Sequence, residues 1–224
     1  MRKGELTRQS VLEHAASLAS QVGLEGLTIG RLAEELALSK SGLFAHFRSK
    51  EALQIQVLEF AGQRFVDTVV RPALATPRGE PRVRALFERW LEWPRTGALA
   101  AGCLFVALAT ELDDRPGPAR DRLVQLQKDW MEVLATSFRG GIREGHFRPD
   151  ADPEQFAYDI YGIMLAHHHA SRLLGDPGAR ARARRGFEAL LDAARPNIAE
   201  RPAVRRRAPA ARSGRSRLAA THRH

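Results

Sequence analysis

The sequence predicts an all-α fold of about nine helices, with a three-helix unit at the N-terminus and a larger helical bundle after it. Apolar residues recur along most of the chain at intervals of three and four, the spacing of one helix face, and no segment alternates as a strand does. The 224 residues are 44% hydrophobic and 27% charged, a composition that excludes a wholly disordered chain. Residues that cap or stop helices divide the chain into its elements.

Three short helices are expected at the N-terminus. The first begins with Thr7 as its N-cap and stops at Gly23. Thr28 caps the second helix, and Ser39 caps a third that ends at Phe47. These lengths and the short break between the last two helices are typical of a helix-turn-helix unit with a supporting first helix.

Six further helices complete the prediction. Ser49 caps a fourth helix that must end near Pro72, because proline disfavours continuation of a helix. After a linker rich in Pro, Gly and Arg, the remaining helices are expected over 82–93, 99–112, 118–144, 153–174 and 178–194. The last two are separated by a very short turn and therefore form an antiparallel hairpin.

The outer face of the third helix suits a DNA groove. A recognition helix needs small and polar side chains to enter a major groove about 12 Å wide, with apolar residues that anchor it from behind. Leu43 and Phe47 supply the anchor. The outer positions are Ser39, Lys40, Ser41, Gly42 and Ala45.

The stretch 28–53 reads TIGRLAEELALSKSGLFAHFRSKEAL. It resembles the DNA-binding motif of the TetR/AcrR family of bacterial transcriptional regulators, and several positions agree in register. The resemblance implies a homodimer that binds a double-stranded DNA operator. It also implies a C-terminal effector-binding and dimerisation bundle, and most simply a repressor that leaves its operator when a small apolar molecule binds.

The resemblance also assigns residue roles. Thr28 would present its hydroxyl and amide to a phosphate, Lys40 would lie near base edges, and Lys50 would touch the DNA backbone. The full set of expected DNA contacts is Thr28, Ser39, Lys40, Ser41, Gly42, Phe44, Ala45, His46 and Lys50. Taken singly, Thr28 and Ser39 are also ordinary helix caps, and Lys50 is also an ordinary solvated lysine, so the joint pattern carries the interpretation.

Two positions depart from the family pattern. Phe44 stands where tyrosine is usual and lacks the hydroxyl that would bond a phosphate, so its contact must be apolar, for example to a thymine methyl. Ala37 replaces the glycine common at the turn. That turn therefore needs either another backbone conformation or some strain.

The bundle contains most of the bulky side chains, and the resemblance implies an inducer pocket there. The candidate lining is Trp90, Phe105, Trp130, Leu134, Met164 and His168, for each of which plain core packing is the alternative.

The last two helices carry more apolar residues than one inner face requires. The candidate dimer interface on them is Phe156, Ile160, Ile163, His167, Leu174, Phe187, Leu190 and Leu191. Such a dimer would set two recognition helices about 34–36 Å apart.

Several function classes are not supported. The chain has no G-x-S-x-G elbow, H-E-x-x-H pair, phosphate loop or paired cysteines, so we expect neither an enzyme nor a cofactor. No metal is expected either, because the consecutive residues 167–169 point about 100° apart on a helix. Cys103 is expected to be a buried inert thiol, with a redox sensor as the alternative.

The cellular setting is also predicted. The longest weakly polar run, 97–110, falls short of the roughly 20 apolar residues of a membrane span, so no membrane partner is expected. One cysteine suits a reducing cytoplasm.

The positive charge is concentrated at the C-terminus. The formal net charge is +9, and residues 196–224 contain eight arginines against one acidic residue, Glu200. The predicted organisation is a DNA-binding domain over 1–50, a ligand-binding and dimerisation domain over 51–195, and a disordered Arg-rich tail over 196–224. The alternative function is a nonspecific architectural DNA-binding protein that uses the helix-turn-helix and the tail without an effector.

Overall fold

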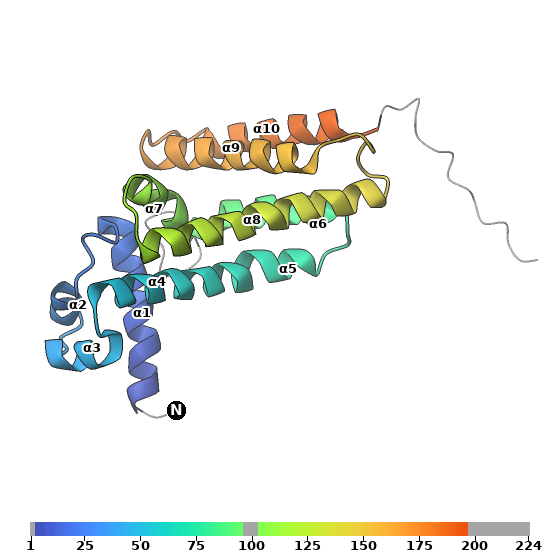
Figure 1. Ribbon diagram of the computed structural model, residues 1–224. Helices are drawn as coiled ribbons and strands as arrows, with labels where there is room; N and C mark the ends of the chain where they lie inside the picture. Colours follow the sequence, from blue (N-terminus) through green and yellow to red (C-terminus); the bar gives the residue numbers. More distant parts are fainter. Residues whose placement is uncertain (1–2, 96–102, 197–224) are drawn as a thin grey trace, which may run out of the picture.

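The computed structural model describes residues 3–95 and 103–196, in which every regular element is helical (Figure 1). The helices are α1 Lys3–Val22, α2 Ile29–Glu35, α3 Lys40–Phe47, α4 Lys50–Phe65, α5 Arg71–Leu74, α6 Glu80–Glu92, α7 Leu104–Leu112, α8 Pro118–Arg143, α9 Pro153–Arg172 and α10 Ala179–Ala194. A π-helical turn over Val66–Val70 joins α4 to α5 without a break. If these three are counted as one continuous helix, the described part of the chain contains nine helices, and the all-α prediction is confirmed. The first part of the helix predicted over 99–112, and the predicted tail from residue 197 onward, lie outside the described residues.

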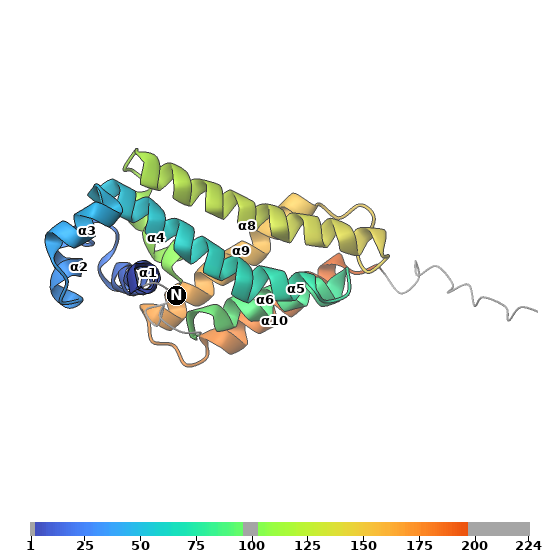
Figure 2. The same cartoon turned by 90° about the horizontal axis from the view of Figure 1, so that it is seen from below.

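The helices form a small N-terminal unit and a layered bundle. Helices α1 to α3 gather at one end, and α4 leads from them into the bundle (Figure 1). Helix α8 packs beside α4 along its length, which both views show, and on its other side contacts α9 (Figure 2). The α9–α10 hairpin covers α8 and α6, and α7 packs against α1 and α8.

Capping side chains start the helices where the sequence predicts. The Oγ1 of Thr28 accepts from the Arg31 amide at 3.1 Å, and the Oγ of Ser39 accepts from the Gly42 amide at 3.1 Å. Ser49 caps α4 in the same way. The prediction for Thr7 is wrong, because α1 already begins at Lys3 and includes that residue.

The predicted end of the fourth helix also needs correction, because the chain stays helical through Pro72 to Leu74. The π-helical turn explains this difference. The amide of Arg71 bonds to the carbonyl of Val66, five residues back. The widened turn just before Pro72 accommodates the ring and the missing N–H that would break an ordinary α-helix there.

Stacked aromatic rings form much of the bundle core. Phe138 of α8 stacks on Phe147 at 4.3 Å and on Phe156 of α9 at 4.0 Å between ring centroids. Phe87 of α6 stacks on Phe187 of α10 at 4.0 Å. Phe138, Phe147 and Phe87 are fully buried. These contacts hold the α9–α10 hairpin onto the rest of the bundle.

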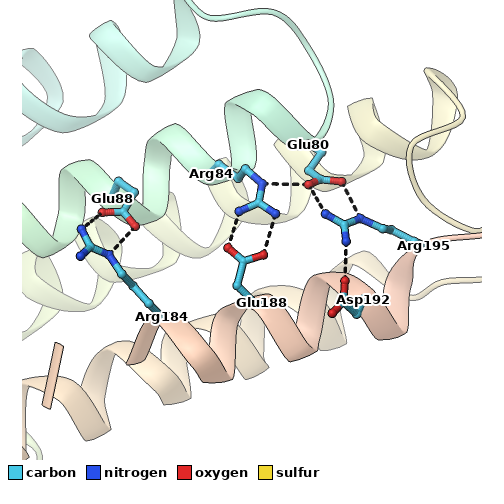
Figure 3. A network of polar contacts seen from close by, with 7 residues as sticks. All are labelled: Glu80, Arg84, Glu88, Arg184, Glu188, Asp192 and Arg195. Carbon is cyan, nitrogen blue, oxygen red and sulfur yellow. Dashed lines mark hydrogen bonds and ion pairs between the residues drawn. The ribbon is translucent and has the colours of Figure 1, made fainter. Parts of the chain in front are cut away.

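A row of ion pairs adds to the α6–α10 contact (Figure 3). Arg184 forms two hydrogen bonds with Glu88, at 2.9 and 2.6 Å, and Arg84 bridges Glu80 and Glu188. Arg195, just beyond α10, reaches back to Glu80 at 2.9 Å. The Arg195 guanidinium, followed by that of Arg84, lowers the pKa of Glu80 to about 2. This row of ion pairs holds α10 against α6 and also fixes its position along the length of α6.

Candidate functional site

Helix α3 is anchored from behind and open in front. Leu43 and Phe47 are 1% exposed, and Leu32 of α2 is fully buried. Figure 1 shows α3 at the outer edge of the N-terminal unit, and none of the other helices in the described part of the chain lies over its outer side. The predicted contact residues that are exposed are Thr28, Ser39, Lys40, Ser41, Gly42, Phe44, Ala45 and His46, and Lys50 is half-buried.

Phe44 is the one large apolar side chain on this outer face. Its side chain is 51% exposed, although phenylalanine is normally buried. The neighbouring Lys40 is also exposed, with its Nζ 4.0 Å from Glu34. Helix α3 therefore presents an apolar and a cationic side chain together among small residues.

The backbone of the turn between α2 and α3 is strained, as one of the two predicted alternatives required. Ala37 has a φ of +51°, in the left-handed region that glycine adopts at little cost. The Leu38 amide bonds back to the Ala33 carbonyl at 2.9 Å and closes the turn. Arg48, just after α3, has a φ of +54°, which the sequence analysis did not anticipate.

Lys50 holds the N-terminal unit together. Its Nζ donates to the backbone carbonyl and to the carboxylate of Glu25, each at 2.8 Å, and this pairing lowers the pKa of Glu25. Gln54, one turn later on α4, donates to the Leu24 carbonyl at 2.8 Å. The start of α4 is thereby bonded to the loop between α1 and α2.

Helix α7 bonds to that same loop through Glu111. The Glu111 carboxylate accepts from the Leu24 amide at 2.9 Å and from the Glu25 amide at 2.6 Å. The approach requires a glycine at position 23, where φ is +76° and a Cβ would lie 2.2 Å from a Glu111 oxygen. The role of Glu111 could not be predicted from the sequence, because its partners lie 86 and 87 residues away and no local pattern marks it.

An apolar cavity of about 120 Å³ lies in the bundle, between α4, α6, α7, α8 and α9. Of the predicted lining residues, Trp90, Phe105 and Trp130 line it. Leu134 and Met164 are instead buried core residues, and His168 is half-buried outside the lining. The lining residues that the sequence analysis missed include Phe65, Val66 and Val70 of the continuous α4–α5 helix and Tyr161 of α9.

Polar groups in the cavity wall are mostly paired or neutral. The Tyr161 hydroxyl donates to Gln127, whose amide nitrogen donates to the Phe105 carbonyl at 3.3 Å. Burial raises the pKa of Tyr161 to about 12 and that of Cys103 to about 11. Cys103 is buried as predicted, and its raised pKa leaves a protonated thiol, which is a poor nucleophile.

The candidate dimer face requires a correction. Phe156, Ile160, Phe187 and Leu191 are at most 4% exposed within this single chain, so they pack its own core and cannot form a contact surface. Ile163, His167 and Leu190 are half-buried, and Leu174 is 64% exposed. The large exposed apolar residues in and just after α9 are Tyr158, Leu165, Leu173 and Leu174. The predicted interface contains too many residues, because the α9–α10 hairpin uses these four buried side chains to cover α6 and α8.

Among the described residues, no group of three or more His, Cys, Asp or Glu side chains is placed to hold a metal ion. None of the helices in these residues is long and apolar enough to cross a membrane.

Comparison with known proteins agrees with this architecture, a helix-turn-helix unit joined to a helical bundle that encloses a cavity. Residues 11–57 match the family model of bacterial regulatory proteins of the tetR family, and residues 79–187 match the tetracyclin repressor-like C-terminal domain. The HTH-type transcriptional repressor KstR2 of Mycobacterium tuberculosis is 30% identical over 157 residues, which are 67% of this chain and 72% of that protein. The chain therefore belongs to the TetR family of DNA-binding transcriptional regulators.

Solved structures show the same fold. A TetR regulator from Chloroflexus aurantiacus has a TM-score of 0.74 at 26% identity, over 86% of this chain and 96% of its own. AibR, solved with isovaleryl coenzyme A and operator DNA, has a TM-score of 0.63 at 21% identity, over 84% of this chain and 98% of its own.

Proposed function

We propose that the protein is a ligand-responsive repressor that binds operator DNA as a homodimer and releases it when a small, mainly apolar molecule enters the cavity. The observation that carries the proposal is helix α3, which is anchored by buried Leu43 and Phe47 and presents a small, polar outer face with Phe44 exposed on it. KstR2 is itself a repressor, and AibR is a structure of this fold that holds both a small-molecule ligand and operator DNA.

In this proposal, α3 lies in the major groove. Lys40 and Ser41 at its start reach base edges, and Phe44 contacts a thymine methyl. Thr28 lies at the N-terminus of α2, where backbone amides and a hydroxyl favour a phosphate. Lys50 adds positive charge near the DNA backbone even though its ammonium is bonded to Glu25.

The homodimer meets a geometric need. Two recognition helices must reach successive major grooves on one side of the duplex, about 34–36 Å apart. Helix α9 offers the exposed apolar residues Tyr158 and Leu165, and Leu173 and Leu174 follow at its end. Pairing of this face with its twofold copy would bury them. The cytoplasm, where chromosomal DNA is accessible, is the proposed location.

Two helices connect the cavity to the DNA-binding unit. Phe65 and Val66 of the α4 region line the cavity, and α4 begins at Lys50, which is bonded to the α1–α2 loop. Phe105 of α7 lines the cavity, and α7 ends near Glu111, which is bonded to the same loop. A ligand that binds the two states of the protein with different affinity would shift the spacing of the recognition helices through these contacts.

Selection from a random DNA pool tests the DNA-binding part of the proposal. The wild-type chain should enrich one palindromic sequence. Lys40→Ala should change the preferred bases, whereas Lys50→Ala should weaken all sequences alike, because it removes a positive charge and leaves the Glu25 carboxylate unpaired. Lys128→Ala, an exposed substitution on α8, is the control and should change neither. Enrichment of no sequence, or identical behaviour of the first two variants, would contradict the proposal.

A further inference from the structure

The cavity wall carries a negative charge and, among the described residues, no positive charge. Among the described residues that line it, Asp129 is the only side chain that is charged at neutral pH, and no Lys, Arg or His takes part. The Tyr161 hydroxyl and the Cys103 thiol stay protonated, because burial raises both pKa values. A bound anion would therefore lie near a carboxylate with no cation to balance it.

The rings around the cavity form a partial cage. The Phe65 ring lies at 82° to Phe105 and at 89° to Trp130, with centroids 5.8 and 5.0 Å away. Trp90 and Tyr161 also line the cavity. A cavity wall rich in aromatic rings favours an organic cation, because the face of each ring that is turned to the cavity attracts positive charge.

Asp129 lies at the solvent side of this cage. It is exposed on α8 directly before Trp130, and Val66 of the π-helical turn, which is 39% exposed, also lines the cavity. Its carboxylate accepts one hydrogen bond from Gln125, at 2.7 Å, and forms no ion pair with any described residue. By contrast, Glu132, one turn further along α8, is paired with Arg139. The carboxylate beside the cavity is thus the one left without a cation.

We propose that the effector is a small organic cation, with an apolar or aromatic body inside the ring cage and a protonated amine at the opening beside Asp129. The cavity of about 120 Å³ is close in size to an engineered protein cavity of about 150 Å³ that binds benzene. The body of the ligand is therefore about one ring or a short branched chain. The inference rests on the proposed function and specifies the charge and size of its ligand.

Isothermal titration calorimetry of the full chain tests the inference with three probes of the same shape: benzylamine, benzyl alcohol and benzoate. At pH 7 and low salt, benzylamine should bind about fivefold to tenfold more tightly than benzyl alcohol, and benzoate should bind most weakly. Asp129→Asn should remove the advantage of the amine and leave the affinity for the alcohol unchanged. Asp121→Asn is the control, an exposed carboxylate on the same helix outside the cavity, and should leave the order intact.

The outcomes separate this inference from the proposed function. If benzyl alcohol binds and benzylamine has no advantage, or if Asp129→Asn keeps that advantage, the cation inference is overturned while the apolar cavity remains an effector site. If benzoate binds most tightly, the charge argument is likewise refuted. If none of the three probes binds at millimolar concentration, the effector cavity itself fails, and the inference fails with it.

Discussion

Replacing Glu111 with alanine tests the connection between α7 and the DNA-binding unit. The substitution removes two hydrogen bonds to a charged acceptor, from the amides of Leu24 and Glu25. A bond of this kind stabilises a structure by about 1.5–3 kcal/mol when buried. The Leu24 contact is only partly buried and the Glu25 contact is exposed. We therefore expect the substitution to lower the free energy of local loop opening by about 2 kcal/mol for the two bonds together.

Hydrogen exchange of the loop amides measures the free energy of local loop opening directly. A loss of about 2 kcal/mol corresponds to about 30-fold faster exchange at Leu24 and Glu25. Glu111→Gln keeps one neutral acceptor oxygen and should give an intermediate rate. Asp114→Ala, an exposed change just after α7, is the control and should leave the rates unchanged. Equal exchange in Glu111→Ala and the wild-type chain would refute the idea that this carboxylate holds the loop.

Three other substitutions and one titration probe separate parts of the structure. Ala37→Gly should raise the free energy of unfolding by about 1 kcal/mol in urea denaturation, since glycine relieves the positive φ; a lower stability would contradict the strain. The pKa of Glu80 is lowered to about 2, so its contribution is complete above the usual carboxylate pKa of 4.5 and is lost as pH falls from there towards 2. Arg195→Gln should flatten that acid dependence of the melting temperature, and an unchanged slope would refute the pairing. Phe44→Ala should weaken operator binding about tenfold in mobility-shift titrations without changing the melting temperature; full affinity would exclude Phe44 from the interface.

Local chemistry made much of the fold predictable. Thr28, Ser39 and Ser49 are predicted as helix caps and act as caps, because a cap depends only on residues two or three positions away. Gly23 likewise ends α1 with a positive φ. The exposed face of α3 follows from the same short-range spacing, since Leu43 and Phe47 can only anchor the helix from one side.

The remainder depends on contacts between residues far apart in the chain. Pro72 does not end its helix, because a π-helical turn before it absorbs the proline. Leu134 and Met164 have the apolar character of cavity residues, and only the packing of α8 and α9 decides that they lie in the core. Glu111 looks like any exposed acidic residue until α7 is placed against the loop after α1.

Competitive binding of the full chain to two DNAs measures whether α3 reads a DNA sequence. The two DNAs are the palindrome enriched from the random pool and a scrambled duplex of the same length and composition, both at ~150 mM salt. We expect the palindrome to bind at least about 10³-fold more tightly than the scrambled duplex and with two chains per duplex. Equal affinity for the two DNAs would contradict this expectation and would favour a nonspecific architectural protein.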